Sequence, residues 1–197
     1  IKTLGGQRKY VEPAKGTVNP RVFIDRLAKK MPANVTVVAD VGQNQIWTCT
    51  EYKFRKEGRL LTSGGMGTMG YSVPAAIGAK MADNSRETVA ICGDGAFQMS
   101  FMELATAVQF GVDIKVVVMT NNRLGMVREL QTNGYHDRQT AVFLDGSPDF
   151  IKLAEAYGIP AMRVYDDDTM EKGVEMLAEH KGICLVEVVV DKDMPTL

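Results

Sequence analysis

Short apolar runs alternate along the chain with segments in which apolar residues recur every three to four positions. The runs are rich in Val, Ile and Ala and contain few polar residues. Runs of this kind predict strands that are covered on both faces, as in a parallel sheet. The predicted strands span residues 35–39, 88–92, 114–120, 161–164 and 183–190.

The segments between these runs predict helices. One of them has an apolar face of residues spaced i, i+3, i+4 and i+7, namely Phe101, Leu104, Ala105 and Val108. Another contains Pro74, which the first turn of a helix tolerates. The predicted helices span residues 20–30, 72–81, 101–108, 149–157 and 169–179.

This alternation predicts right-handed βαβ units and an α/β fold, a doubly wound and mainly parallel sheet with helices on both faces. The segment Leu60-Leu61-Thr62 makes a poor strand. Ligands of such folds lie at the carboxyl ends of the strands, so the loops that follow the strands are where chemistry is expected.

Composition and charge exclude several classes of protein. The chain of 197 residues has a formal net charge of -1, which gives no basic footprint for nucleic acid. No apolar stretch approaches the roughly 20 residues of a membrane span. The 3 cysteines are scattered, which favours a reducing compartment, and the cytoplasm is the default expectation. The 2 histidines lie far apart, which argues against a His-rich metal site.

The start of the chain resembles a linker. The first residue is Ile1 rather than Met, and residues 1–18 have no apolar periodicity. We therefore interpret residues 1–18 as a linker from an upstream domain and residues 19–197 as one domain of a longer protein.

Loops rich in glycine follow the predicted strand ends. They are ADVGQNQIW (39–47), TSGGMGTMG (62–70), GDGAFQ (93–98) and NNRLGMV (121–127). Glycine lets the backbone approach a ligand closely, and a helix N-terminus after such a loop favours a phosphate.

Asp94 and Asn121 stand out among the loop residues. Asp94 lies between two glycines after one strand, and Asn121 follows the next strand, one helix and one strand later. A carboxylate beside a phosphate would repel it, and a Mg²⁺ ion between them resolves the conflict by taking carboxylate, amide and phosphate oxygens. The two residues together predict a metal that holds a diphosphate. Taken singly, G-D-G is a common turn and N-N a common cap.

A dinucleotide site is the alternative from the same loops. Gly65, Gly67 and Gly70 fit G-x-G-x-x-G, and Glu87 lies at about the distance of a ribose-binding acid. This alternative gives a nicotinamide- or flavin-binding oxidoreductase domain, or a non-catalytic nucleotide-binding module. A purely structural interpretation of this loop is a glycine-rich turn that leads from a strand to a helix. A non-enzymatic interaction domain is disfavoured, because it would not need four glycine-containing loops at strand ends.

The motifs together resemble the thiamine diphosphate enzymes, whose signature is G-D-G followed after such an interval by N-N. Three segments resemble the acetolactate synthase (acetohydroxyacid synthase) family in particular, in the C-terminal cofactor-binding domain of its catalytic subunit. They are DVGQNQIW, LTSGGMGTMGYSVPAAIGAK and GDGAFQMSFMELATAVQFGVDIKVVVMTNNRLGMVRELQ. The resemblance covers the chain from about Asn19 to its end.

The resemblance implies roles for individual residues. Asp94, the Asn121 side chain and the Arg123 carbonyl would bind Mg²⁺. Met69, beneath the cofactor, and Val127, near the reacting centre, would serve catalysis. Met126 and Leu130 would line the substrate pocket. The residues implied to bind the cofactor are Val41, Gly42, Gln43, Asn44, Gly67, Met69, Asp94, Gly95, Ala96, Asn121, Leu124, Gly125 and Met126.

Three positions depart from the family pattern. Asn44 replaces the usual His, so that a diphosphate contact through its amide is expected without the positive charge. Leu130 replaces the usual Trp, which enlarges the acceptor pocket and leaves the preference among 2-keto acids open. Arg123 replaces Glu or Gln, which matters little if only its carbonyl binds metal.

The resemblance also implies activity and partners. Pyruvate would be decarboxylated and joined to a second 2-keto acid, a step of branched-chain amino acid biosynthesis. The activating Glu comes from a neighbouring subunit in this family, so we expect a homodimer or higher homo-oligomer, and the family often recruits a regulatory subunit. FAD would bind a central domain outside this chain. The chain alone is predicted to be inactive.

Related enzymes remain as alternatives within the same cofactor class. They are pyruvate oxidase, glyoxylate carboligase and the 2-keto acid decarboxylases. A naturally separate diphosphate-domain subunit is a further alternative, which the linker-like start disfavours.

Overall fold

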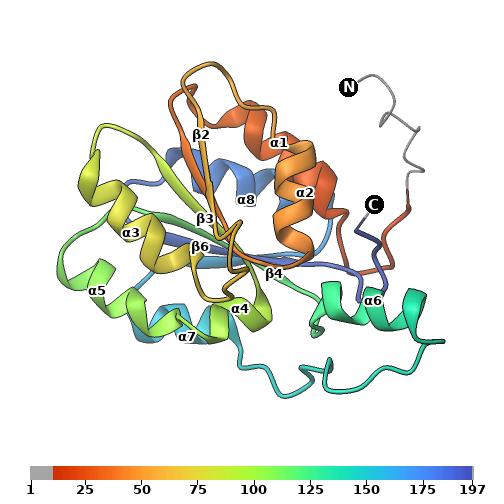
Figure 1. Ribbon diagram of the computed structural model, residues 1–197. Helices are drawn as coiled ribbons and strands as arrows, with labels where there is room; N and C mark the ends of the chain where they lie inside the picture. The colour runs from red at the N-terminus through yellow and green to blue at the C-terminus, as the bar shows by residue number, and fades with distance from the viewer. Residues whose placement is uncertain (1–10, 197) are drawn as a thin grey trace.

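The computed structural model describes residues 11–196 and contains one sheet of 6 parallel strands (Figure 1). The strands are β1 (Thr36–Ala39), β2 (Arg59–Thr62), β3 (Thr88–Gly93), β4 (Lys115–Thr120), β5 (Ala161–Val164) and β6 (Cys184–Val189). Their order across the sheet is β2-β1-β3-β4-β6-β5. The predicted α/β class with a doubly wound parallel sheet is confirmed.

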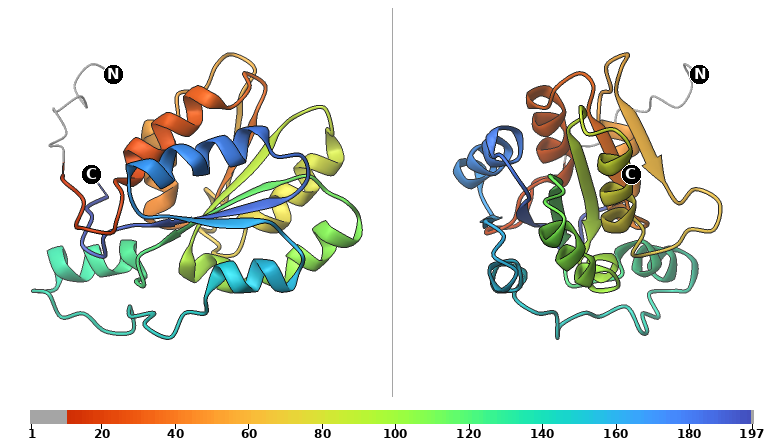
Figure 2. Two further views of the ribbon diagram at one scale, coloured as in Figure 1. Left: turned by 180° about the vertical axis from the view of Figure 1, so that it is seen from behind. Right: turned by 90° about the vertical axis from the view of Figure 1, so that its left-hand side faces the viewer.

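Helices cover both faces of this sheet. They are α1 (Pro20–Lys30), α2 (Gln43–Glu51), α3 (Ser72–Ala82), α4 (Asp94–Gln98), α5 (Leu104–Gln109), α6 (Gly125–Gly134), α7 (Phe150–Ala156) and α8 (Asp167–Glu179), with a 3-10 turn η1 (Phe101–Glu103). One core contains side chains of α1, α2 and α8, and the other contains those of α3, α4, α5 and α7. Figure 2 shows α1 and α8 on one side of the sheet and α5 and α7 on the other.

Each core is built by the apolar runs that predicted the strands. Val37, Ile91 and Val117 point into the first core, whereas Val38, Ala90 and Val116 point into the second. Successive strand residues face opposite sides of a sheet, so a strand buried on both faces must be apolar throughout.

The structure adds elements that the sequence pattern did not predict. The segment 60–62 belongs to a strand, β2, which pairs in parallel with β1 at the edge of the sheet. Helix α2 occupies most of the predicted loop 39–47, and α6 begins inside the predicted loop 121–127. The loops around the site are therefore shorter than expected and end in helix N-termini.

The predicted apolar face of 101–108 is right for Phe101 and Leu104, which lie in or against the second core, and wrong for Ala105 and Val108, which are exposed. The segment begins with the 3-10 turn η1 and continues as α5, where Leu104 and Ala107 are buried. Val108 is 43% exposed. A 3-10 turn advances three residues per turn rather than 3.6, so it rotates the residues that follow relative to a continuous α-helix.

The amino-terminal part of the predicted linker, residues 1–10, lies outside the described residues. Val18 is buried and forms an isolated parallel bridge with Val190.

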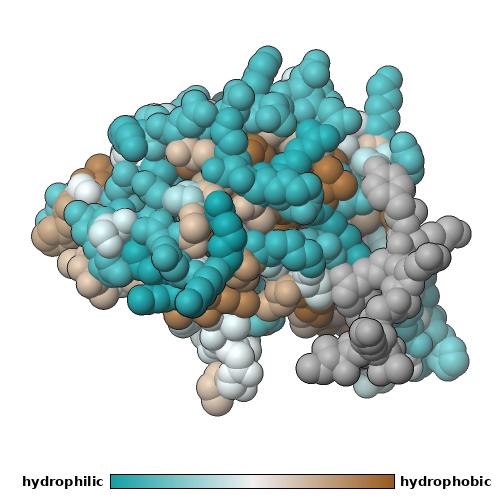
Figure 3. Space-filling view, turned by 90° about the horizontal axis from the view of Figure 1, so that it is seen from above, coloured by the Kyte–Doolittle hydropathy of each residue, from teal (hydrophilic) through white to brown (hydrophobic). Residues whose placement is uncertain are grey.

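The face that is uppermost in Figure 1 is mainly hydrophilic, with small, separate hydrophobic areas (Figure 3). Among the described residues, no helix has the length and apolar character that crossing a membrane requires.

Candidate functional site

A pocket opens at the carboxyl ends of β1, β3 and β4. Strand β2 lies next to β1 on one side, and β3 lies next to β1 on its other side. The strand order therefore reverses between β1 and β3, and these two strands flank the switch point of the topology. The pocket is lined by Val41, Gly42, Gln43, Asn44, Trp47, Met69, Gly93, Asp94, Gly95, Ala96, Met119, Asn121, Arg123, Leu124, Gly125, Met126 and Val127.

The predicted site residues come together in this pocket, with two exceptions. Gly67 lies on an exposed turn, and Leu130 is 62% exposed on α6, and neither lines the pocket. Gly93, which precedes Asp94, also lines the pocket, as do Trp47 and Met119, which sequence reasoning missed. Both are buried residues of regular elements, so nothing in the local pattern separates them from the core.

Asp94 is buried at the start of α4 and is 1% exposed. Its Oδ1 accepts a hydrogen bond of 2.8 Å from the Gly95 N–H. Its Oδ2 accepts from the N–H groups of Asn121, at 3.1 Å, and Asn122, at 2.6 Å. Burial outweighs these bonds and raises the pKa of Asp94 to about 6. A cation beside this carboxyl group would favour its ionised form.

The segment after β4 turns sharply and presents oxygen atoms. Asn122 has a φ of 54°, in the left-handed region that Asn tolerates. Arg123 forms an isolated antiparallel bridge with Phe143, and the bonds on either side use the Asn122 carbonyl and the Leu124 N–H. The N–H and carbonyl of Arg123 therefore point away from Phe143. That N–H donates to Asn121 Oδ1 at 3.0 Å, so the Arg123 carbonyl lies on the same side as Asn121.

These donors fit Mg²⁺. Within residues 11–196 no group of three or more His, Cys, Asp or Glu side chains could hold a metal. A metal in this pocket therefore depends on one carboxylate, Asp94, with neutral oxygens from Asn121 and Arg123. Hard oxygen donors that leave positions for water and phosphate are the usual environment of Mg²⁺.

Helices α2 and α6 begin at the pocket. Helix α2 begins at Gln43 and α6 begins at Gly125, and both residues line the pocket. Such N-termini favour anions through their unpaired N–H groups and the helix dipole. Gly42, with a φ of 141°, makes the turn into α2, which a residue with a side chain adopts only under strain.

Side chains also approach two glycines of these loops closely. A Cβ added to Gly125 would lie 1.9 Å from Gln43 Oε1, and a Cβ added to Gly95 would lie 2.8 Å from Leu124 Cδ2. The cradle predicted for the diphosphate is thus closely packed on its protein side.

Asp40 anchors the loop that carries Met69. Its side chain is fully buried, and it accepts from the N–H groups of Gly70, at 3.0 Å, and Ser72, at 2.7 Å. Met69 precedes this anchored stretch, and its Cε lies 3.4 Å from a Cβ built on Gly95. Sequence reasoning missed Asp40, although an acidic residue directly after an apolar strand was visible in the sequence.

The amide of Asn44 is committed to the fold. Its Nδ2 donates to the carbonyls of Asp40, at 2.8 Å, and Ile91, at 3.3 Å. Its Oδ1 faces Gly42 and Gly93. Asn44 lines the pocket as predicted, but the donor that was expected to meet a diphosphate points into the protein.

The dinucleotide alternative loses its acidic residue. Gly67 and Gly70 both have positive φ, and their loop does connect β2 to α3. Glu87, however, directly precedes β3 and its carbonyl accepts from the Thr36 N–H. It therefore lies at the amino edge of the sheet, and the glycine loop lies at the carboxyl edge.

Comparison with known proteins gives a family match over most of the chain. Residues 40–188 match the family described as "Thiamine pyrophosphate enzyme, C-terminal TPP binding domain".

Curated relatives match nearly the whole chain. The acetolactate synthase large subunit of Lactococcus lactis is 38% identical over 181 residues, which are 92% of this chain and 31% of the relative. The mitochondrial acetolactate synthase catalytic subunit of Saccharomyces cerevisiae is 38% identical over 192 residues, 95% of this chain and 28% of the relative. The acetolactate synthase isozyme 2 large subunit of Escherichia coli is 34% identical over 184 residues, 93% and 33% of the two chains. The chain thus spans about a third or less of the length of these relatives.

Proposed function

The chain belongs to the family of C-terminal cofactor-binding domains of thiamine pyrophosphate enzymes, and from this premise we propose that it is the diphosphate-binding domain of an acetolactate synthase-type carboligase. The observation that carries the proposal is the buried Asp94 carboxylate, which accepts from the Asn121 N–H and lines one pocket with Asn121 and Arg123 at the switch point of the sheet. The similarity to acetolactate synthases over more than nine-tenths of the chain supports the choice of enzyme.

Different residues of the pocket are proposed to bind the metal and the diphosphate. Asp94, Asn121 and the Arg123 carbonyl hold Mg²⁺, and the N-termini of α2 and α6 receive the diphosphate. Met69, held by the loop that Asp40 anchors, and Leu124 pack against Gly95 on the wall of the pocket. Thiamine diphosphate, when bound, supplies an electron sink for the decarboxylation of a 2-keto acid.

The acceptor side of the pocket is proposed to lie along α6. Leu130 follows Met126 by four residues, so the two side chains share one face of the helix. Met126 lines the pocket, and Leu130 extends this face outward to solvent. We propose that this position helps to select the second 2-keto acid, and that Leu in place of Trp leaves room for a larger acceptor.

A homodimer or higher homo-oligomer completes the proposed site, and a regulatory subunit joins it as a further proposed partner. Met66, Met99 and Met102 are 90%, 59% and 56% exposed, on the loop that carries Met69 and on the segment 99–103 beside it. Exposed apolar residues next to a pocket support a partner surface there.

The first test is calorimetric titration of thiamine diphosphate into the whole polypeptide that carries this domain, with Mg²⁺ and with EDTA. We expect binding that requires Mg²⁺ and is lost in Asp94→Ala. Asp168→Ala, an exposed acidic residue of α8, is the matched control and should bind like the wild type. Thiamine diphosphate binding that is equally strong in EDTA, or binding of NADH without metal, would contradict the proposal.

Product analysis with pyruvate then distinguishes the carboligase from related enzymes. Acetolactate supports the proposal. Acetyl phosphate indicates a pyruvate oxidase, tartronate semialdehyde from glyoxylate indicates a glyoxylate carboligase, and free aldehyde indicates a decarboxylase.

A further inference from the structure

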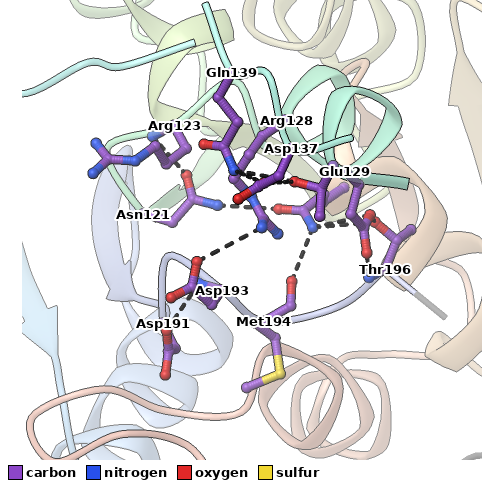
Figure 4. Close-up of polar contacts among 12 residues, drawn as sticks. Asn121, Arg123, Arg128, Glu129, Asp137, Gln139, Asp191, Asp193, Met194 and Thr196 are labelled. Carbon is purple, nitrogen blue, oxygen red and sulfur yellow. Dashed lines mark hydrogen bonds and ion pairs between the residues drawn. The ribbon is translucent and has the colours of Figure 1, made fainter. Parts of the chain in front are cut away.

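A chain of polar contacts leads from Asn121 away from the pocket (Figure 4). Gln43, which is 4% exposed, is its central member. Gln43 Oε1 accepts a hydrogen bond of 3.1 Å from Asn121 Nδ2. Gln43 Nε2 donates to the Met194 carbonyl at 2.9 Å and to Thr196 Oγ1 at 3.1 Å. The amide therefore links a predicted metal ligand to the segment 194–196.

Glu129 of α6 holds the far end of this chain. One carboxylate oxygen, Oε1, accepts from the Thr196 N–H at 2.7 Å. The other, Oε2, accepts from the Thr196 hydroxyl and lies 3.3 Å from Gln43 Nε2. Figure 4 shows Glu129 and Thr196 side by side, with Met194 and Asp193 on the adjoining stretch. Both oxygens of Glu129 are thus used as acceptors.

This arrangement fixes the direction of the Gln43 amide. The partners around Nε2 are a carboxylate, a carbonyl and a hydroxyl whose hydrogen is given to Glu129, so each of them accepts. Only the NH₂ end of an amide can face such a group of acceptors. The Oε1 end of Gln43 must then face Asn121, and it accepts only from an N–H donor.

The direction of the Gln43 amide in turn fixes that of Asn121. Asn121 must offer its NH₂ group to Gln43, which leaves Oδ1 on the side of the Arg123 N–H and carbonyl. Oδ1 can bind a cation, whereas a reversed amide would present hydrogens to it.

The fit of Gln43 against this site is tight. A Cβ on Gly125 would lie 1.9 Å from Gln43 Oε1 and 3.1 Å from Asn121 Nδ2. The contact between the two amides therefore depends on a glycine, which has no side chain, at position 125.

We infer that Glu129 is a positioning residue for the metal site: through Thr196 and Gln43 it sets the amide of Asn121 with its oxygen toward the cation. This inference rests on the proposed function, because it concerns the same Mg²⁺ site. Glu129 contributes no atom to the pocket lining.

The test is the affinity for Mn²⁺, used as a paramagnetic substitute for Mg²⁺, in the whole polypeptide with saturating thiamine diphosphate. Electron paramagnetic resonance measures the free Mn²⁺ directly and requires no turnover. Glu129→Gln replaces one acceptor oxygen by an NH₂ group, so the carboxylate no longer defines the direction of Gln43. We expect Mn²⁺ binding to weaken by roughly 10-fold, as for other outer ligands of metal sites.

Glu155→Gln is the matched control, because it removes the same charge from an exposed residue of α7. It should leave Mn²⁺ affinity unchanged, which separates positioning from a general loss of negative charge. Thr196→Val removes the hydroxyl that connects Glu129 to Gln43 but keeps the N–H, and should weaken binding in the same direction by a smaller factor. It carries the test if Glu129→Gln does not fold.

The outcomes separate the two proposals. Equal Mn²⁺ affinity in the wild type, Glu129→Gln and Thr196→Val overturns the positioning role and leaves the proposed function standing. A lower melting temperature of Glu129→Gln with unchanged Mn²⁺ affinity also overturns it, since that result marks a purely structural contact. A wild type that does not bind Mn²⁺ with thiamine diphosphate overturns both.

Discussion

Asp94 is a carboxyl group whose burial favours the protonated form more strongly than water does. Backbone N–H groups of Gly95, Asn121 and Asn122 donate to it, yet burial still raises its pKa to about 6. Its ordinary pKa is 3.8. The metal-free site therefore stores an electrostatic cost above pH 6 that a divalent cation would remove.

This cost predicts a pH-dependent stability of the metal-free protein. Between about pH 4 and 6 the folded state binds a proton at Asp94 that the unfolded chain has released, so stability falls as pH rises through this window. The contribution is about 3 kcal/mol at most, from a shift of about two pKa units. Asp94→Asn should remove it. Urea unfolding in EDTA from pH 4 to 7 measures the difference between the two proteins, and a difference that does not change with pH would contradict the prediction.

The role of a single residue could be predicted where the residue follows a predicted strand. Asp94 and Asn121 directly follow apolar runs, so their meeting at one sheet edge could be expected before the structure was known. Glu129 could not be identified in this way, because its partner Thr196 lies 67 positions away in the sequence. Gln43 was assigned to the cofactor by resemblance, but the direction of its amide depends on the same distant contacts.

At the scale of elements, the strands buried on both faces and the helices with a strong apolar face were predicted within one or two residues. Helix α1 matches its predicted bounds, and α8 begins two residues early at Asp167, behind a capping box made by Asp166 and Thr169. The missed elements lack these patterns. Strand β2 is short and half-exposed at the sheet edge, and only Gly125 and Arg128 of α6 are buried.

Two helical glycines give opposite predictions for the same substitution. A Cβ on Gly173 of α8 would lie 2.6 Å from Val164 Cγ2, and a β-branched strand residue cannot rotate away freely. Gly173→Ala should therefore destabilise the protein by about 1–3 kcal/mol. Gly78 of α3 has no atom within 4 Å of its built Cβ, so Gly78→Ala should stabilise by about 0.5–1 kcal/mol.

Urea unfolding of both variants measures these free energies. Stabilisation by Gly173→Ala would show that α8 can move away from β5 and β6 at little cost. Neither substitution touches the pocket, so cofactor binding should stay unchanged in both.

At the scale of the whole molecule, the two edges of the sheet have different chemistry. The carboxyl edge carries the pocket. The amino edge carries buried cations that bind backbone carbonyls: Lys115 donates to His180 and Gly182, and Lys80 donates to Asn84 and Arg86. These contacts complete the hydrogen bonding of chain segments that enter the sheet at the edge opposite the pocket.

The part of the proposed site that the 197-residue chain contains predicts its activity in isolation. It contains the metal and diphosphate side of the proposed site, and no residue of it is expected to activate the aminopyrimidine of the cofactor. The isolated chain should form no acetolactate from pyruvate, with Mg²⁺ and thiamine diphosphate present. A colorimetric assay for acetolactate tests this, with the whole polypeptide as the positive control, and turnover by the isolated chain would refute it.

Gly125 has an evolutionary consequence. Every other amino acid brings a Cβ, and that atom would overlap Gln43 Oε1 at 1.9 Å. A substitution of Gly125 would have to displace the Gln43 amide and its contact with Asn121, so the tolerance of position 125 depends on the residue at position 43. Leu130, which is 62% exposed on the same helix, meets no comparable constraint. Under the proposed function, the acceptor side of α6 is therefore less constrained than the first residue of that helix.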